Sequence, residues 1–407
     1  MKLQGIRVLD LSRFLPGPML TQHMADHGAE VIKIESPGEG EPTRHIGEKR
    51  DGVTVYFANT QRGRQSVVLN LKHPEAREAF MRLAETADVI VEGFRPGVAE
   101  RIGVGYAQVA KRAPQVVYAS ISSYGQDGPY RDIATHDLAT EAMAGVLSLT
   151  RGRDGKPSIP GFPASDVISA TMTLAGVLMA LLRRRDSGRG DYLDMSMAEC
   201  MLTSIPNNLG AAMAERRQID PDHERSLGGN ALYRLYETAD AQWIALGSQE
   251  AKFVVTLLTG LGRPDLIEIA SGLPGPRQAP VRAFLEETFR TRTRAEWEAW
   301  FAGRDFPFAP VKSLPEALDD PHFRARGMVT TDARGWDHIG SPIRFADEPA
   351  RPDFSAAAPG QHTAAVLAKV GYTPADIERL AQAGAIGLPD PAEVARYAGT
   401  ATPSVSP

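Results

Sequence analysis

Residues 6–11, with the sequence IRVLDL, predict a buried strand, and the pattern that follows this strand decides the fold. A helix is expected from Met19 to His27, ended by Gly28, and a second strand is expected over 30–35. Further strands are expected over 66–71, 88–92, 116–121 and 192–197, with a helix over 74–86. Strands and helices that alternate at this spacing indicate βαβ units around a mostly parallel sheet, so the sequence predicts an α/β fold. Ligands bind such sheets at the carboxyl ends of the strands.

The pattern becomes helical from His136 onward, and a long apolar helix is expected from Ala164 to Arg185. Polar residues 221–229 are expected to link this part of the chain to a compact second domain, which opens with a hairpin. A short strand is expected over 341–345. The last ~20 residues, rich in Ala, Pro, Thr and Ser, are expected to form a loose tail.

Composition excludes several classes of function. The 407 residues carry 45 Lys and Arg against 50 Asp and Glu, spread along the chain, whereas a nucleic-acid binder needs a basic face. The single cysteine, Cys200, excludes a disulfide framework and a Cys-rich metal site, and it favours the reducing cytoplasm. Charged residues within 1–20 argue against a signal peptide, and the longest apolar stretch, 167–182, is shorter than a membrane span. We therefore expect neither a nucleic-acid nor a membrane partner.

The common motifs of parallel-sheet enzymes are missing. The loop after the first strand, residues 12–18 (SRFLPGP), has one glycine, so it is not the glycine-rich dinucleotide fingerprint, and the chain has no P-loop motif. His23 and His27 are four residues apart, but no Glu follows His23 as in zinc hydrolases, so no metal site is expected. Cys200 lies in an apolar helical setting that favours a buried structural thiol over a nucleophile.

Three features can carry chemistry. Asp166 lies at the start of the long apolar helix, where it is either an N-cap or a carboxylate that acts as nucleophile or base. His136 begins another helix and is either a packed or surface residue, or a proton-transfer group facing Asp166 across one cleft. Four arginines beside the strands either form a solvated face or bind an anionic ligand; they are Arg62, Arg64, Arg95 and Arg101.

Several short motifs resemble one family in their order and spacing. They are residues 3–12 with 16–18, 28–35, 91–97, 124–130, 187–190, 309–311 and 360–363. Over nearly all of 1–390 the chain resembles the class III CoA-transferases (CaiB/BaiF), which include formyl-CoA transferase, the carnitine and bile-acid CoA-transferases and α-methylacyl-CoA racemase. The resemblance implies a Rossmann-like large domain with a parallel sheet, formed by 1–220 and 330–390, a smaller α+β domain over 225–325, and the tail over 391–407. It also implies an interlocked homodimer.

The resemblance further implies the reaction. The family carboxylate falls on Asp166, which in similar transferases attacks an acyl-CoA thioester and forms a mixed anhydride, then an aspartyl-CoA thioester, before a carboxylic acid collects the CoA. Backbone N–H groups would stabilise the oxyanion. Family CoA contacts carry over onto Phe14, Leu15, Arg64, Phe94, Arg95 and Arg101, with Arg64 and Arg101 at the phosphates. The chain departs from the family at Ser36, where Arg is frequent, and at Arg64, where Lys is usual. Coenzyme A is then a substrate, and no separate cofactor is expected.

The resemblance is compatible with two reactions, CoA transfer and racemisation. His136 followed by Asp137 resembles the racemases, in which the histidine and the family carboxylate form an acid–base pair, and Glu250 resembles the acid that orients this histidine. Residues 41–45 and 55–59 instead resemble an insertion of the transferases, although the glycine-rich loop of some transferases is reduced to 227–230. We expect a CoA-transferase, with an α-methylacyl-CoA racemase or epimerase as the alternative. A non-catalytic CoA-binding protein is disfavoured because Asp166 and the motif around it are intact.

Overall fold

The computed structural model describes residues 1–152, 154–332 and 334–398, and the chain divides into two compact units. The large unit comprises 1–144, 161–204 and the chain from 321 onward, and the small unit comprises Gly145–Pro160 and Ile205–Asp320. These boundaries differ from the expected ones, because 145–160 and 205–220 group with the small unit and 321–325 with the large unit.

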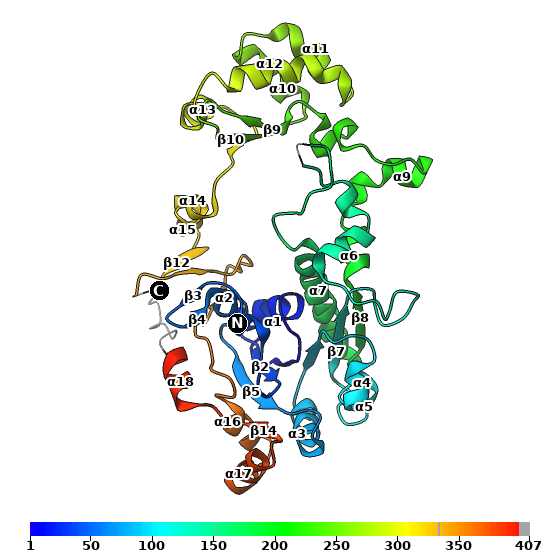
Figure 1. The fold of residues 1–407 in the computed structure, drawn as a ribbon, viewed down its shortest axis with the longest axis vertical. Helices are drawn as coiled ribbons and strands as arrows, with labels where there is room; N and C mark the ends of the chain where they lie inside the picture. The colour runs from blue at the N-terminus through cyan, green and yellow to red at the C-terminus, as the bar shows by residue number, and fades with distance from the viewer. Residues whose placement is uncertain (153, 333, 399–407) are drawn as a thin grey trace. The chain divides into compact units, whose positions relative to one another are not determined.

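The large unit is built on one seven-stranded sheet (Figure 1). Its strand order is β14-β5-β2-β1-β6-β7-β8, and every neighbouring pair is parallel except β14 with β5. The six parallel strands, counted along the chain, therefore stand in the doubly wound order 3-2-1-4-5-6, and the predicted parallel sheet is confirmed. The strands are β1 (Arg7–Asp10), β2 (Glu30–Glu35), β5 (Gln65–Leu69), β6 (Val89–Glu92), β7 (Val117–Ser122), β8 (Tyr192–Ser196) and β14 (Ile386–Gly387).

Both faces of this sheet are covered by helices. Successive residues of a strand point to opposite faces, so Val8 packs with Leu20 and Met24 on one face while Leu9 packs on the other. The first face carries α1 (Pro16–Asp26) and α7 (Ala164–Ser187). The second face carries α3 (Pro74–Glu85), α4 (Val98–Ile102), α5 (Tyr106–Val109), α16 (Thr363–Ala368) and α17 (Pro374–Gln382). The C-terminal strand β14 pairs with β5, so it belongs to the same sheet as the N-terminal strands. The C-terminal helices α16 and α17, orange to red in Figure 1, pack on this sheet.

Helix α7 has 24 residues and is longer than the apolar stretch within it. By length and composition alone it could cross a membrane, but a core helix of a sheet protein meets the same criterion. One face of α7, including Ala170 and Val177, is buried against the sheet. The opposite face leaves Leu178, Met179 and Leu182 exposed.

The C-terminal part of the large unit corrects two expectations. Residues 341–345 do not form a strand; Pro342 lacks an N–H donor, and the antiparallel pair nearby joins β12 (Val329–Thr331) to β13 (Asp337–Ile339). The expected loose tail is wrong for α18 (Pro391–Ala398), because Tyr397 is buried and its ring packs edge-on against Phe57 at 5.8 Å. Residues 399–407 lie outside the described part of the chain.

The other helices and strands of the large unit are β3 (Lys49–Arg50), β4 (Val53–Thr54), α2 (Val55–Gln61), α6 (Asp137–Met143), α8 (Met197–Thr203) and α15 (Pro321–Ala325).

The small unit is an α+β arrangement around a three-stranded antiparallel sheet of order β11-β10-β9. The expected hairpin is confirmed, and its turn places Ala241 at φ 56°. Trp297 fills the centre of this core and donates its indole N–H to the carbonyl of Phe289 at 2.9 Å. The elements are α9 (Gly210–Glu215), β9 (Tyr233–Glu237), β10 (Trp243–Gly247), α10 (Ala251–Gly260), α11 (Ile267–Ala270), α12 (Ala279–Phe289), α13 (Arg294–Phe301), β11 (Phe308–Pro310) and α14 (Leu314–Leu318).

Candidate functional site

A cavity of about 320 Å³ lies in the large unit where β1, β6 and β7 end. The strand order reverses direction between β1 and β6, which is where doubly wound sheets bind ligands. The cavity is lined by loop residues that follow these strands and by the starts of α6 and α7. Five of the predicted site residues meet here: Phe14, Phe94, Arg95, His136 and Asp166.

Asp166 is in the first turn of α7, but it does not cap the helix. The N-cap residue is Pro163, and the carboxylate of Asp137 accepts hydrogen bonds from the backbone N–H groups of Ser165 at 2.9 Å and of Asp166 at 3.1 Å. Glu141 accepts from the N–H of Ala164 at 3.1 Å. Across the described residues no hydrogen bond to the Asp166 carboxylate is found, so the N-cap interpretation is wrong and this carboxylate remains available to substrate.

Three carboxylates therefore gather at the start of α7, and we refer to Asp137, Glu141 and Asp166 as the α7 carboxylate cluster. Burial, together with the negative charges of Asp137 and Glu141, raises the pKa of Asp166 to about 7. Burial and Asp137 also raise the pKa of Glu141. Within the described part of the chain, no lysine or arginine forms an ion pair with this cluster. Asp166 is thus an unusually basic carboxylate, as acid–base and nucleophilic groups in active sites commonly are.

His136 lies in the same cavity as Asp166, as expected. It is the exposed N-cap residue of α6, and its ring meets that of Phe14 edge-on, with the centroids 6.3 Å apart. The next residue, Asp137, caps α7, so one short segment places the histidine and fixes the start of the helix that carries Asp166. The sequence contained this signal, since Asp137 follows His136 directly and Glu141 is one helical turn further on.

Arg64 is not at a ligand surface. Its side chain is buried and donates to Asp10 Oδ2 at 2.8 Å, to Gln61 Oε1 at 2.7 Å and to the carbonyl of Pro18. The prediction that Arg64 meets a CoA phosphate therefore finds no support in this geometry. The physical reason is that Asp10 is wholly buried and takes Arg64 as a partner.

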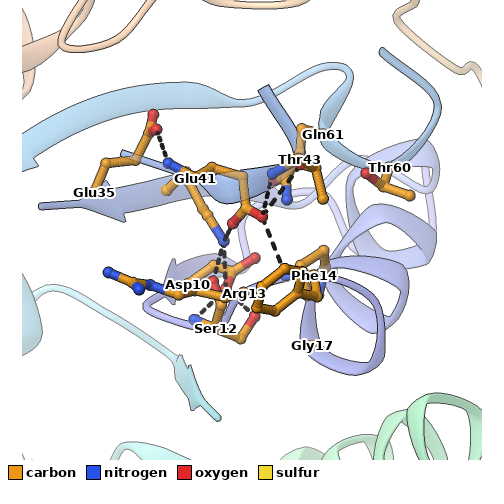
Figure 2. Close-up of polar contacts among 12 residues, drawn as sticks. Asp10, Ser12, Arg13, Phe14, Gly17, Glu35, Glu41, Thr43, Thr60 and Gln61 are labelled. Atoms are coloured by element: carbon orange, nitrogen blue, oxygen red, sulfur yellow. Dashed lines mark hydrogen bonds and ion pairs between the residues drawn. The ribbon is translucent and has the colours of Figure 1, made fainter. Parts of the chain in front are cut away.

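Arg64 belongs to a buried set of charges beneath the loop of residues 12–18, and we refer to Asp10, Lys33, Glu41 and Arg64 as the loop cluster. Lys33 Nζ lies 3.6 Å from Asp10 Oδ1 and 3.1 Å from Glu41 Oε2. Although burial works in the opposite direction, the charges of Lys33 and Arg64 and hydrogen bonds from Ser12 and Thr21 hold the pKa of Asp10 below its usual value. Figure 2 shows Asp10 close to Ser12, and the carboxylate of Glu41 pointing toward Phe14.

A second cavity of about 210 Å³ lies beside the first and shares Ser12, Arg13 and Phe94 with it. Its walls are mostly apolar, and the exposed Lys72 lies at its edge. Sequence reasoning missed Lys72, although its position directly after a predicted strand was a usable signal. Arg101 is exposed on α4, whose residues Val98 and Ile102 line this cavity. Leu15, by contrast, is the N-cap of α1 and lines neither of these two cavities.

Glu250 belongs to the small unit. It is the exposed N-cap residue of α10, and its carboxylate accepts a hydrogen bond from the N–H of Gln249 at 3.1 Å. That backbone hydrogen bond lowers the pKa of Glu250. Its action on His136 stays a prediction.

Neither a metal site nor a reactive thiol is found among the described residues. Within residues 1–152, 154–332 and 334–398, no group of three or more His, Cys, Asp or Glu side chains is placed to hold a metal ion. Cys200 is buried in α8, and this burial raises the pKa of its thiol to about 11, which keeps it protonated.

Comparison with known proteins identifies the family of this chain. Residues 3–363 match the family model described as CoA-transferase family III. The succinyl-CoA:glutarate CoA-transferase of Mus musculus is 30% identical over 94% of this chain and 90% of its own length, and the α-methylacyl-CoA racemase of Homo sapiens is 31% identical over 93% and 96%. The crystal structure of a CaiB/BaiF family protein from Brucella suis is 29% identical, superimposes with a TM-score of 0.79, and covers 90% of this chain and 99% of that one. The chain is therefore an enzyme of CoA-transferase family III.

Proposed function

We propose that the protein transfers CoA from an acyl-CoA thioester to a carboxylic acid, with Asp166 as the nucleophile. The observation that carries this proposal is the Asp166 carboxylate itself. It lies in a cavity at the ends of the sheet strands and, across the described residues, has no hydrogen-bond or ion-pair partner. Its pKa is raised to about 7, which makes it a stronger nucleophile than an ordinary carboxylate.

The proposed reaction has four steps that exchange bonds without oxidation or reduction. Asp166 attacks the thioester carbonyl, the C–S bond breaks, and a mixed anhydride and CoA thiolate result. The thiolate then attacks the Asp166 carbonyl, which releases the donor acid and leaves an aspartyl-CoA thioester. The acceptor carboxylate attacks the carbonyl of this thioester, its C–S bond breaks, and a new anhydride and CoA thiolate result. The thiolate finally attacks the acceptor carbonyl of that anhydride, which forms the product acyl-CoA and regenerates Asp166.

The two neighbouring cavities support a position for CoA. We propose that the adenosine end occupies the apolar second cavity, with the exposed cations Lys72, Arg101 and Arg13 near its phosphates. The pantetheine arm then passes Phe94, which lines both cavities, and brings the thioester to Asp166.

The acceptor is proposed to be a dicarboxylic acid. Three arginines line the cavity of Asp166, and one of them can pair with the carboxylate that does not react: Arg13, Arg95 or Arg131. The succinyl-CoA:glutarate relative is named for substrates of this class.

The test is a transfer assay with a panel of acyl-CoA donors and mono- and dicarboxylate acceptors, in which each new acyl-CoA is identified by mass spectrometry. We expect at least one dicarboxylate to accept CoA, and we expect Asp166→Asn to abolish transfer. Transfer by Asp166→Asn at a rate near that of the wild type would contradict the proposal.

A racemase is the second candidate, because His136 and Asp166 line the same cavity and can act as an acid–base pair on the two sides of an acyl α-carbon. Incubation with an (R)-2-methylacyl-CoA in deuterium oxide separates the two reactions. Deuterium at the α-carbon, lost in His136→Phe, supports the racemase. Transfer that survives His136→Phe, without α-deuterium in the wild type, supports the transferase.

We further propose that the protein works as an interlocked homodimer in the cytoplasm and uses CoA only as a substrate, with no resident cofactor. The exposed apolar face of α7, formed by Leu178, Met179 and Leu182, supports an oligomer, since such a patch favours a protein partner. Light scattering is expected to give twice the mass of one chain.

A further inference from the structure

We propose that Glu41 is a positioning residue of the active site, which acts by holding the backbone of Phe14 so that the Phe14 ring meets His136. This inference rests on the proposed function, because it assigns a role in the same cavity. Glu41 is far from Phe14 in the sequence and lines the second cavity rather than the cavity of Asp166. Its effect on the reaction would therefore be indirect.

Phe14 has a backbone conformation that needs support. Its φ is 62°, in the left-handed region that residues with a Cβ atom rarely adopt and that other contacts must stabilise. The N–H of Phe14 donates to Glu41 Oε1 at 3.1 Å, and Figure 2 shows this hydrogen bond linking the loop to Glu41. The carboxylate of Glu41 is thus the partner of the one strained non-glycine residue among residues 12–18.

Glu41 is itself held rigidly. It is 1% exposed, its Oε2 lies 3.1 Å from Lys33 Nζ, and its Oε1 also accepts from the Thr43 hydroxyl at 3.2 Å. Its own N–H donates to Glu35 Oε2 at 2.8 Å. A buried carboxylate held by this ion pair and by the Thr43 hydroxyl can hold the strained loop in one conformation. A surface carboxylate would lose this effect to side-chain motion.

The two ends of the loop are fixed without Glu41. At one end, Ser12 donates its N–H to Asp10 Oδ1 at 2.9 Å, and Lys33 Nζ donates to the Ser12 carbonyl. At the other end, Gly17 packs so closely on Ser12 that a Cβ atom on Gly17 would lie 2.0 Å from the Ser12 hydroxyl oxygen. Within residues 12–18, the hydrogen bond to Glu41 is made by Phe14, in the middle of the loop.

The position of Phe14 matters because its ring forms part of the cavity wall beside His136. The ring centroids are 6.3 Å apart at an interplanar angle of 85°, an edge-to-face contact. If Phe14 relaxes to an ordinary φ, its ring leaves this contact and the wall of the cavity that also holds Asp166 changes shape. A displacement of about 1 Å at a reacting group can lower a rate by roughly 100-fold.

The first test compares Glu41→Ala with Glu39→Ala, which removes an exposed carboxylate two residues away. The readout is the His136 ring signal in the NMR spectrum of the full chain with isotope-labelled histidine, assigned by its loss in His136→Gln. We expect Glu41→Ala to shift or broaden this signal and Glu39→Ala to leave it unchanged. An unchanged His136 signal in folded Glu41→Ala overturns the inference. Because no substrate is used, this result does not depend on which reaction the enzyme performs.

The second test asks whether Glu41 acts through Phe14. Glycine adopts a φ of about +60° without strain, so in the Phe14→Gly background the loop no longer needs Glu41. We expect Glu41→Ala to lower kcat/KM for the acyl-CoA about 10- to 100-fold in the wild-type background and less than about threefold in the Phe14→Gly background. An equal loss in both backgrounds overturns the inference, because a general loss of stability would act equally in both.

If Glu41→Ala fails to fold, Glu41→Gln serves as the second variant for the same measurement. The glutamine has the same shape but one acceptor oxygen, for which the Lys33 ammonium competes with the Phe14 N–H. We expect a change of the His136 signal in the same direction as in Glu41→Ala, together with a normal far-UV circular dichroism spectrum. A His136 signal identical to that of the wild type in folded Glu41→Gln counts against the inference.

Discussion

The loop cluster and the α7 carboxylate cluster lie at the same end of the large unit and differ in their charge balance. In the loop cluster two carboxylates, Asp10 and Glu41, face two cations. In the α7 carboxylate cluster three carboxylates gather, and no Lys or Arg of the described chain pairs with them. The pKa of Asp10 is accordingly lowered in spite of complete burial, whereas the pKa of Asp166 is raised to about 7.

This difference shows that burial alone does not decide what a carboxylate does. Cations and hydroxyl donors around Asp10 stabilise its charge, so Asp10 works as a structural partner that holds Arg64 and the loop. Burial and the like charges of Asp137 and Glu141 destabilise the negative form of Asp166, so this carboxylate binds a proton or attacks a carbonyl carbon more readily. Variants of Asp166, Asp10, Asp137 and Glu92 test this contrast.

Asp166→Asn should have the largest effect. We expect transfer activity to fall by about 10⁴-fold or more, as for removal of a nucleophile. The same variant should be more stable than the wild type at about pH 8. Protonated Asp166 contributes stability to the folded state, and this contribution is lost as the pH rises through its folded pKa of about 7. The asparagine of the variant does not ionise, so the variant loses no stability in this way.

Thermal unfolding at two pH values checks this sign. The gain in Tm of Asp166→Asn over the wild type should be larger at about pH 8 than at about pH 5. A gain that is equal at both pH values, or a variant that is less stable at the higher pH, would mean that the neighbouring carboxylates do not destabilise the ionised form.

Asp10→Asn should have the next largest effect, in the opposite direction. It leaves Lys33 and Arg64 buried with one carboxylate between them, and breaking a buried pair costs about 3–5 kcal/mol of unfolding free energy. Urea unfolding measures this loss as a lower midpoint. Asp186→Asn, which removes an exposed partner of Arg183, is the matched control and should cost about 0.5 kcal/mol or less. Equal costs for the two variants would show that the loop cluster is not structurally important.

Asp137→Asn should have a smaller effect that bears on the electrostatics alone. Asparagine keeps an oxygen for the N–H groups of Ser165 and Asp166 but removes one negative charge from the cluster. We expect the pKa of Asp166 to fall from about 7, so the acidic limb of the kcat/KM profile moves to lower pH by about one unit. A profile that does not move would contradict the role given to Asp137.

Glu92→Gln should have the smallest effect. Glu92 is buried at the end of β6 and accepts from the N–H of Phe94 at 2.7 Å, and burial raises its pKa to about 7. Above that pH the ionised form of Glu92 destabilises the folded state. We therefore expect the free energy of unfolding of Glu92→Gln, relative to that of the wild type, to rise by about 1 kcal/mol between about pH 5.5 and pH 8.5. No pH dependence of this difference would show that Glu92 is solvated in the folded state.

The sequence predicted the sheet because strands and helices depend on local patterns. It also predicted that His136 and Asp166 could face one cleft, and both side chains line the same cavity. Long runs of β-branched and aliphatic residues predicted the six parallel strands, whereas β14 has two residues and gives no run to detect. Residues 341–345 have a strand-like composition but no partner strand, which composition does not reveal.

The predictions for Arg64 and for the N-cap of α7 failed for one physical reason. The role of a charged side chain is decided by its partners, and these partners are distant in the sequence. Arg64 has the position of a phosphate ligand, but Asp10, 54 residues earlier, draws it inward. Asp166 has the position of an N-cap, but Asp137 caps the helix instead. Glu41 supports Phe14 across 27 residues, and nothing in the sequence indicates that Phe14 has a positive φ.

Covalent trapping asks whether Asp166 is the nucleophile. The enzyme is incubated with an acyl-CoA and hydroxylamine at about pH 8 and at about pH 5, and the peptide that contains Asp166 is examined by mass spectrometry. With the concentration of unprotonated hydroxylamine kept equal, we expect a hydroxamate on Asp166 at the higher pH and much less at the lower one, because the attacking carboxylate has a pKa of about 7. Transfer activity with no modification of Asp166, or with a hydroxamate on another carboxylate, would contradict this expectation.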